Sequence, residues 1–311
     1  MPHTRRNAFI AAQLVFAAAI VWYAFRALSG QWDEAAARLA SLDVGWALVA
    51  IATIIVLLTY VLLIDTWRRT LAAWSAALPF GAAARIWFVS NLGKYIPGKI
   101  WSIAAMGVMA RENAVSPVAA AGSSILIQLV TIASGIGVVL VTGARAIEQP
   151  VLAVVVASVV LASIAATPVI LPAVVRWAAG MVGREVVVPP LPARIVWEAF
   201  FRATLSWVAY GIAFQLFVRA VLGEAAGAVT SYIAVYAASY IIGFLALFAP
   251  GGAVVRESAM VAGMLRLGLA VEADALAVAI ASRLWLTVVE LLPGLAYLAI
   301  GRRVSSSTPG R

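Results

Sequence analysis

The stretch Asn91-Leu-Gly-Lys-Tyr-Ile-Pro-Gly-Lys-Ile-Trp101 places two lysines and a Pro-Gly pair inside an otherwise apolar part of the chain. A charged side chain in hydrocarbon is costly, and a helix broken by proline leaves backbone groups that need other partners. Such a segment is expected to lie inside protein or against water. A second break, Pro250-Gly251-Gly252, is followed by Arg256 and Glu257 on another apolar segment. Two interrupted segments in corresponding positions of two halves are typical of a transporter's binding site.

The composition indicates a membrane protein. Hydrophobic residues make up 64% of the chain and charged residues 11%, whereas soluble domains carry about 25% charged residues. The 311 residues are therefore expected to form a single polytopic all-α membrane domain. The chain has no cysteine, which excludes disulfides and thiolate chemistry. The net charge of +9 is assigned mainly to cytoplasmic loops and anionic lipid head groups, and not to nucleic acid binding.

The hydrophobic pattern divides the chain into two halves of similar design. Residues 1–172 form the first half and contain the interrupted segment 80–112. Residues 199–300 form the second half, in which 228–268 repeats the same layout. The connection 173–198 between them contains arginines and a proline cluster, which predicts a cytoplasmic linker. The sequence therefore predicts one membrane domain built from two related halves.

Two threadings of these segments through a membrane remain open. In the first, six full spans, beginning with 8–28, are combined with two re-entrant helical hairpins, 80–112 and 228–268, that enter from opposite faces. In the second, 80–98 and 230–249 cross fully and give eight spans. A helix of about 17 residues is roughly 25 Å long, which is short for a hydrocarbon core of about 30 Å and favours the hairpins.

Both threadings place the two termini in the cytoplasm, in agreement with the excess of arginines assigned to that side. The expected location is the cytoplasmic (inner) membrane of a bacterium or archaeon. The polar tail 301–311 is expected to be disordered.

The opposed hairpins imply a pseudo-inverted repeat. The stretches from Phe88 to Gly135 and from Ala237 to Pro293 share one layout: a helix, a Pro-Gly break, a helix with polar residues, a charged elbow and a span. Opposed hairpins can meet near the membrane midplane and enclose a shared cavity, which is the geometry of alternating access.

The first break offers a candidate anion site. Lys94 and Lys99 flank Pro97-Gly98, and the kink can turn both lysines toward one pocket together with Arg256. The helix ends at Pro97-Gly98 and at Pro250-Gly251-Gly252 expose backbone donors that favour a phosphate group. The competing interpretation is that the lysines extend their ammonium groups to a nearby interface.

Other polar residues near the two breaks are expected to line the same site. Asn91, close before the first break, can cap the broken backbone. Glu257 can balance Arg283 or Lys99, and a purely structural buried ion pair is the alternative interpretation of these charges. Arg283 and Glu290 lie seven residues apart and therefore share a helix face that should look inward. Whether these two residues gate, couple to protons or only pack stays open.

Aromatic residues are interpreted as packing and anchoring groups. Tyr232, Tyr236 and Tyr240 repeat every four residues, which favours a helix-packing stripe over a sugar-stacking platform. Trp46 and Trp67 lie near proposed membrane borders, where tryptophan typically anchors a protein at the interface.

The two interrupted motifs resemble those of the lysylphosphatidylglycerol-synthase transmembrane-region family, also called flippase-like. In the first half the resemblance rests on Asn91-x-x-Lys94-Tyr-Ile-Pro-Gly-Lys-Ile-Trp101, on Arg111 and on the helix after Ser116-Pro117. In the second half it rests on Pro250-Gly-Gly-x-x-x-Arg256-Glu257 and on the span with Arg283. It covers roughly residues 8–300.

The resemblance implies an integral membrane protein that translocates, or helps to translocate, a lipid or lipid-linked glycan. It implies a stand-alone form without the soluble synthase domain. Many relatives carry an acidic residue and an arginine soon after the first Pro-Gly, where this sequence has Ile100, Trp101, Ser102 and Ile103. The resemblance therefore implies no functional carboxylate in the first half of this sequence.

The residues argue against an enzyme. The sequence contains no metal-ligand cluster, no Ser/His/Asp set and no nucleotide-binding motif, and no cofactor is expected. The predicted function is translocation of an anionic phospholipid or a polyprenyl-phosphate-linked glycan, whose head group binds in a midplane cavity. The alternative is a non-transporting scaffold or regulator of a separate envelope glycosyltransferase or lipid-modifying enzyme. A small-solute transporter is a third option.

Overall fold

The computed structural model describes residues 43–74, 77–95, 101–143, 149–181, 190–246, 252 and 254–306. These ranges contain nine α-helices, one short 3-10 helix and no strand. Five helices are long and apolar enough to cross a membrane: α2 (Trp46–Trp74), α5 (Pro117–Thr142), α6 (Pro150–Met181), α7 (Ala193–Leu222) and α10 (Glu272–Ser306). The all-helical, multi-pass membrane class expected from the composition is confirmed.

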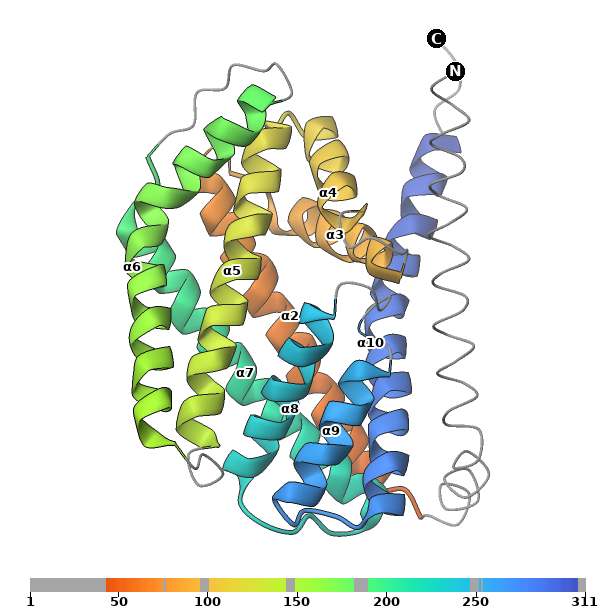
Figure 1. Ribbon diagram of the computed structural model, residues 1–311. Coiled ribbons are helices and arrows are strands. Elements are labelled where there is room, and N and C mark those ends of the chain that lie inside the picture. Colours follow the sequence, from red (N-terminus) through yellow and green to blue (C-terminus); the bar gives the residue numbers. More distant parts are fainter. Residues whose placement is uncertain are drawn as a thin grey trace, which may run out of the picture.

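Four shorter helices accompany the long ones: α3 (Phe80–Asn91), α4 (Trp101–Glu112), α8 (Val229–Leu245) and α9 (Val255–Arg266). The 3-10 helix η1 (Leu92–Tyr95) continues α3 toward the first break. Helices α3 and α4 lie at one end of the bundle, whereas α8 and α9 lie side by side at the other end, as Figure 1 shows. The chain therefore enters and leaves each pair of short helices at the same end of the bundle.

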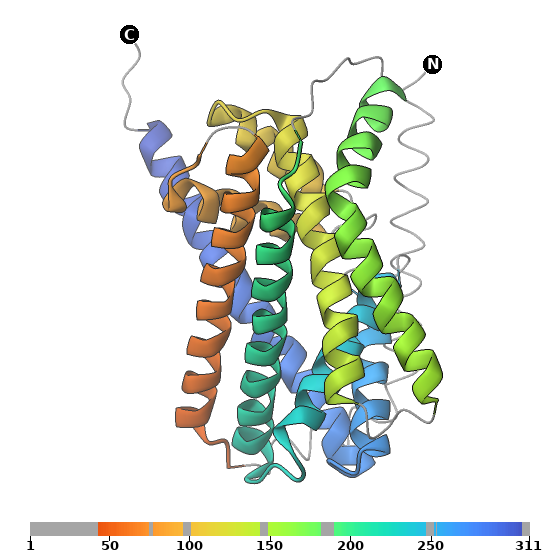
Figure 2. The same cartoon turned by 90° about the vertical axis from the view of Figure 1, so that its left-hand side faces the viewer.

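Helices α2, α7, α5 and α6 run side by side, and α10 crosses behind them at a slant, as Figure 2 shows. Helix α7 packs against α2, α5 and α8, and α6 covers α5 and α7 from outside. Helix α10 contacts α9 at one end of the bundle and α3 at the other. Helix α10 therefore touches both short helical pairs, and so does α5, which contacts α4 and α8.

Hydroxyl groups inside the apolar helices bond to their own backbone. The Thr59 hydroxyl donates to the Ile55 carbonyl at 2.8 Å, and the Thr66 hydroxyl donates to the Leu62 carbonyl at 2.6 Å. A hydrocarbon environment offers no water to such groups, so the helix supplies the acceptor.

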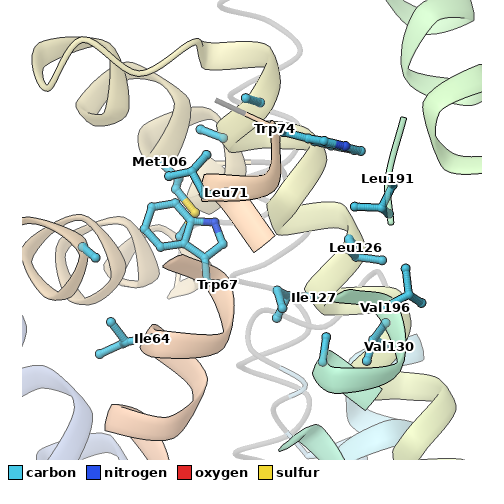
Figure 3. Close-up of a cluster of buried hydrophobic side chains, with 14 of the residues drawn as sticks. Ile64, Trp67, Leu71, Trp74, Met106, Leu126, Ile127, Val130, Leu191 and Val196 are labelled. Atoms are coloured by element: carbon cyan, nitrogen blue, oxygen red, sulfur yellow. The ribbon is translucent and has the colours of Figure 1, made fainter. Parts of the chain in front are cut away.

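A buried hydrophobic cluster joins α2, α4, α5 and α7 near the end that carries α3 and α4 (Figure 3). Trp67 and Leu71 of α2 are fully buried in it, close to Met106 of α4. The Trp74 ring lies so close to Gly122 that no larger residue fits there. The expectation that Trp67 anchors the protein at a membrane interface is therefore wrong, because its ring fills the core. Trp46 is exposed.

A second cluster joins α7, α8 and α10 around Phe214 and Tyr232. The Tyr232 hydroxyl donates to the Ala226 carbonyl at 2.7 Å, and its ring packs edge-on against Phe214. The packing interpretation of the tyrosine stripe is confirmed at this residue. Gly211 lets α7 approach α8 so closely that a methyl group at this position would overlap the backbone of Ile233.

We expect Gly211→Ala to lower the free energy of unfolding by about 1–3 kcal/mol, because overpacking against backbone cannot be relieved by a rotamer change. Gly137→Ala in α5 is the matched control, since nothing lies within 4 Å of a Cβ at Gly137. The control is expected to leave stability unchanged or raised by about 0.5–1 kcal/mol through helix propensity. Unfolding in mixed micelles measures both variants, and equal losses would contradict the close α7–α8 contact.

Two expected segments have other bounds in the structure. Helix α6 continues through Pro168 and Pro172 to Met181, and α7 already begins at Ala193, so both ends of the expected linker 173–198 are helical. Prolines are tolerated inside membrane-spanning helices because neighbouring groups can satisfy the freed backbone carbonyls, so Pro168 and Pro172 do not end α6. Helix α10 continues to Ser306, so residues 301–306 of the expected disordered tail 301–311 are helical. Extending an existing helix costs far less than nucleating one.

The helix that follows each break contacts the next long helix in a similar way. The Ser124 hydroxyl of α5 donates to the Met106 sulfur of α4 at 2.7 Å. The Ser282 hydroxyl of α10 contacts the Met260 sulfur of α9 at 3.6 Å. Both methionines come shortly after a Pro-Gly break. The two halves therefore repeat one local contact.

Candidate functional site

The α8–α9 hairpin depends on two glycines that meet in its interior. Gly252 is buried with a φ of +71°, and a Cβ on it would lie 2.7 Å from the Gly243 carbonyl oxygen. A Cβ on Gly243 would in turn lie 2.7 Å from the Arg256 Cβ. Val254 has a φ of +70°, a strained conformation for a β-branched residue. The close contact places the first turn of α9 directly against α8.

Arg256 lies in this first turn and is only 8% exposed. Its guanidinium carbon lies 5.2 Å from the ring centroids of both Tyr236 and Tyr240 on α8. A cation near a helix N-terminus is unfavourable, and the two aromatic rings offset this with cation–π attraction. Its Nη2 atom is buried and makes no hydrogen bond within the described part of the chain. The guanidinium group thus keeps a donor available inside the protein.

Glu257, the next residue, faces α10. Its Oε1 atom lies 3.7 Å from the Arg283 Nε atom. Neither carboxylate oxygen accepts a hydrogen bond from a described residue. Of the two partners predicted for Glu257, Arg283 is found at ion-pair distance and without a hydrogen bond, whereas Lys99 lies outside the described residues.

One face of α10 carries Arg283 and a second charged residue, Glu290. Glu290 is 8% exposed and acts electrostatically on Tyr210, Tyr236 and Tyr240. It lies two turns from Arg283, so the expectation that this face looks inward is confirmed for Glu290.

The same face of α10 meets the first helical pair. A Cβ on Gly294, one turn beyond Glu290, would lie 3.2 Å from the Phe88 carbonyl oxygen and 3.1 Å from a Leu92 methyl group. Tyr297 stacks on the Phe88 ring with centroids 6.2 Å apart. The end of α3 therefore packs against α10 close to the buried carboxylate.

A series of ring contacts links the two helical pairs. The Phe88 ring of α3 meets Tyr60 of α2 at 5.6 Å, and Tyr60 meets Tyr210 of α7 at 6.3 Å. Tyr210 stacks on Tyr236 of α8 at 5.4 Å. These contacts join the α3 end of the bundle to the residues around Arg256.

We call the central group the polar–aromatic cluster. It is formed by three tyrosines, two arginines and two glutamates: Tyr210, Tyr236, Tyr240, Arg256, Arg283, Glu257 and Glu290. The formal charges of the arginines and glutamates cancel. Tyr240 is 38% exposed, so the cluster reaches the protein surface at that ring. The arrangement can bind an ionic group and exchange ion pairs, and it holds no set of groups suited to nucleophilic catalysis.

The structure brings together five of the residues proposed for the site from the sequence: Gly252, Arg256, Glu257, Arg283 and Glu290. Asn91 is the last residue of α3 and is half-buried, and Lys94 lies in η1. The remaining residues of the predicted site lie outside the described ranges: Pro97, Gly98, Lys99, Pro250 and Gly251.

Sequence reasoning missed the aromatic members of the cluster. The spacing of Tyr236 and Tyr240 was the one signal for them, because residues four apart share a helix face. The spacing favours packing, and the structure adds that both rings lie against the Arg256 guanidinium group. No sequence motif marks Tyr60 and Tyr210, because their position beside the cluster depends on how α2 and α7 pack.

A second group of charges clamps α2 to α7 at the opposite end from α8 and α9. The Asp65 carboxylate accepts hydrogen bonds from Arg68 at 2.7 Å, Arg69 at 2.7 Å and Arg202 at 2.6 Å. Glu198 lies 3.3 Å from Arg69. The Asp65 and Glu198 carboxylates are thus already paired with arginines of this group, so we interpret the group as a structural clamp. Within the described ranges no group of three or more acidic or histidine residues is placed to hold a metal ion.

No family model matches this sequence, and no curated protein matches it. The functional interpretation below therefore starts from the geometry of the cluster.

Proposed function

We propose that this protein is a lipid-translocating, flippase-like membrane transporter. It binds an anionic phospholipid head group, or a polyprenyl-phosphate-linked glycan, at the polar–aromatic cluster and helps it to cross the membrane. The observation that carries the proposal is the buried Nη2 atom of Arg256, which makes no hydrogen bond to a described residue while two tyrosine rings hold the guanidinium group. A phosphate oxygen is the natural acceptor for such a donor.

The arrangement of the short helices supports alternating access. Helices α3 and α4 occupy one end of the bundle and α8 and α9 the other, as opposed re-entrant hairpins would (Figure 1). With the segment 8–28 as an additional span, the five long helices give six spans. The repeated Ser–Met contact after each break fits a pseudo-inverted repeat. In this arrangement the two hairpins move against each other around α10 and open the cluster to either side.

The distribution of arginines supports an orientation. Most arginines of the described helices lie at the end with α3 and α4, namely Arg68, Arg69, Arg85, Arg111, Arg176, Arg194 and Arg202. Arg219 and Arg266 lie at the opposite end, in the last turns of α7 and α9. By the positive-inside rule the α3–α4 end faces the cytoplasm, with both termini on that side of the cytoplasmic membrane.

The surroundings of the cluster favour a lipid. Tyr240 of the cluster is partly exposed, and the same helix also exposes the apolar side chains Ile242 and Leu245, which an acyl chain can contact. Lys94 and Lys99 of the first motif are proposed to contact the same phosphate. The resemblance of both motifs to the lysylphosphatidylglycerol-synthase transmembrane-region family supports a lipid or lipid-linked substrate.

One observation favours the alternative of a membrane scaffold for a separate glycosyltransferase or lipid-modifying enzyme. The charges of the cluster cancel, and Gly243 and Gly252 are in close contact. A cluster with a purely structural role would also be neutral and closely packed. Translocation activity separates the two functions.

The test uses the purified chain in liposomes that contain tail-labelled fluorescent phosphatidylglycerol. We expect dithionite to bleach the inner-leaflet label faster than in protein-free liposomes, because the protein brings that lipid to the outer leaflet. Labelled phosphatidylcholine should move more slowly, since it carries no net negative charge. Equal bleaching with and without protein, for phosphatidylglycerol and for an undecaprenyl-phosphate probe, would favour the scaffold.

A further inference from the structure

The first turn of α9 holds one donor and two acceptors that the described residues leave without hydrogen bonds. The donor is the Nη2 atom of Arg256, and the acceptors are the two carboxylate oxygens of Glu257. A buried polar atom without a partner is unfavourable, and more so when its group is charged. Unsatisfied groups of this kind in a folded protein point to a ligand, a water molecule or an ion that completes them.

Glu257 is the group that the proposed phosphate contact does not satisfy. Both of its oxygens are shielded from bulk water. The nearest cation, the Arg283 Nε atom, is 3.7 Å from Oε1, beyond the roughly 2.7–2.9 Å of a charge-assisted hydrogen bond. A carboxylate needs donors, whereas a phosphate brings only acceptors. The partner that fits Glu257 is therefore a donor group on the substrate.

The same helical turn brings the phosphate and this donor together. The N-terminus of α9 has no side-chain cap, and its positive end favours a phosphate beside the buried Nη2 atom of Arg256. Glu257 is the next residue and acts electrostatically on Arg256, so the two side chains are close. A head group whose phosphate meets Arg256 therefore places the group joined to that phosphate beside Glu257.

The carboxylate discriminates among the groups that can be joined to a phosphate. It repels a second phosphate, and an alkyl group would leave its oxygens unpaired. Hydroxyl and ammonium groups can both donate to it. Arg256 and Arg283 already lie beside Glu257 and would repel a further cation. An uncharged hydroxyl group is therefore the donor that fits best.

We propose that Glu257 binds a hydroxyl group of the substrate and that the protein therefore selects phosphodiester lipids with a polyol head group. The glycerol of phosphatidylglycerol and the sugar of a polyprenyl-phosphate-linked glycan share this chemistry. The inference rests on the proposed lipid-binding function and adds what separates its substrate from other anionic lipids. The hydroxyl group reaches the shielded carboxylate when the two helical hairpins move against each other, as alternating access requires.

The test compares phosphatidylglycerol with phosphatidylethanol. Each lipid carries one phosphodiester charge, but the ethyl group has no hydroxyl. Binding of tail-labelled probes to the full chain in dodecylmaltoside micelles gives the ratio of their dissociation constants. We expect phosphatidylglycerol to bind about 10- to 100-fold more tightly, because phosphatidylethanol leaves the buried carboxylate without a donor.

Two further probes identify the source of the donor. Undecaprenyl-phosphate glucose presents sugar hydroxyls, and the tighter of this probe and phosphatidylglycerol shows whether a sugar or glycerol is the preferred polyol. Phosphatidylethanolamine presents an ammonium group. It should bind more weakly than phosphatidylglycerol, because Arg256 and Arg283 repel a cation at this place.

Substitutions at Glu257 assign the selectivity to this residue. Glu257→Met removes both acceptors and keeps a side chain of similar length, so the ratio for the first two lipids should fall to about one. Glu257→Gln keeps one neutral acceptor and should give an intermediate ratio. Because both lipids have the same charge, loss of the Glu257 charge affects them alike and cancels from the ratio. Glu272→Gln, which changes an exposed carboxylate in the first turn of α10, should retain the ratio of the wild type.

Each other outcome has a distinct meaning. Equal affinities of the wild type for phosphatidylglycerol and phosphatidylethanol overturn the polyol selection and leave lipid binding intact. A preference that persists in Glu257→Met, or that disappears in Glu272→Gln, overturns the assignment to Glu257. Phosphatidylethanolamine that binds as tightly as phosphatidylglycerol overturns the preference for hydroxyl. Absence of binding for every probe overturns the proposed function itself.

Discussion

Arg256→Ala is expected to weaken binding of an anionic lipid by a factor of about 30 or more and to abolish translocation. Removing one member of a buried charge cluster typically costs about 2–5 kcal/mol, and about 1.4 kcal/mol corresponds to a factor of ten. The substitution removes the guanidinium group that Tyr236 and Tyr240 hold, and with it the buried Nη2 donor. It also leaves Glu257 and Glu290 with a single arginine, so the cluster becomes negative and repels a phosphate. Binding in micelles and bleaching in liposomes measure the two effects.

Three further variants make this experiment specific. Arg266→Ala removes an exposed arginine from the last turn of the same helix and should leave binding unchanged. Arg256→Lys keeps the charge but loses the planar group that stacks on both rings, so it should retain part of the affinity. Tyr236→Phe keeps the ring and should bind more tightly than Tyr236→Leu, which removes the cation–π contact. If a folded Arg256→Ala variant binds and translocates lipid as the wild type does, Arg256 has no part in substrate binding.

Gly252→Ala is expected to lower the free energy of unfolding by about 2–5 kcal/mol. Two costs combine at this position. Gly252 has a φ of +71°, where an L side chain is strained, and its Cβ would lie 2.7 Å from the Gly243 carbonyl oxygen. Backbone atoms cannot move aside as a flexible side chain does. The first turn of α9 should therefore separate from α8, and amide hydrogen exchange in α9 should become faster.

Gly223→Ala separates the two costs. Gly223 has a φ of +82°, but nothing lies within 4 Å of a Cβ at this position. The Gly223→Ala variant should lower the free energy of unfolding by only about 1–2 kcal/mol, which is the cost of the left-handed conformation alone. Chemical unfolding in mixed micelles compares both variants with the wild type. If both lose the same amount, the close contact between Gly252 and Gly243 does not exist in solution.

Several boundaries of the fold are predictable from local chemistry. The expected hairpin 80–112 matches the start of α3 and the end of α4. Pro117 is the first residue of α5, as its type indicates, and Ser116 occupies the preceding position without a capping hydrogen bond from its side chain. The C-terminal limit of α6 is not predictable in this way: the helix passes through Pro168 and Pro172, residues that usually end a helix, and continues to Met181.

The amino-acid pattern alone is sufficient for the class of this protein, its helical segments and the two breaks with their charges. Apolar runs of span length and Pro-Gly pairs act over a few residues, so they are visible in the sequence. The partners of those charges depend on tertiary packing. Arg256 meets Tyr236 because Gly243 and Gly252 bring α8 and α9 into contact, and Glu257 meets Arg283 because α10 packs beside α9. Contacts between distant helices arise from shape and small residues, for which no local sequence signal exists.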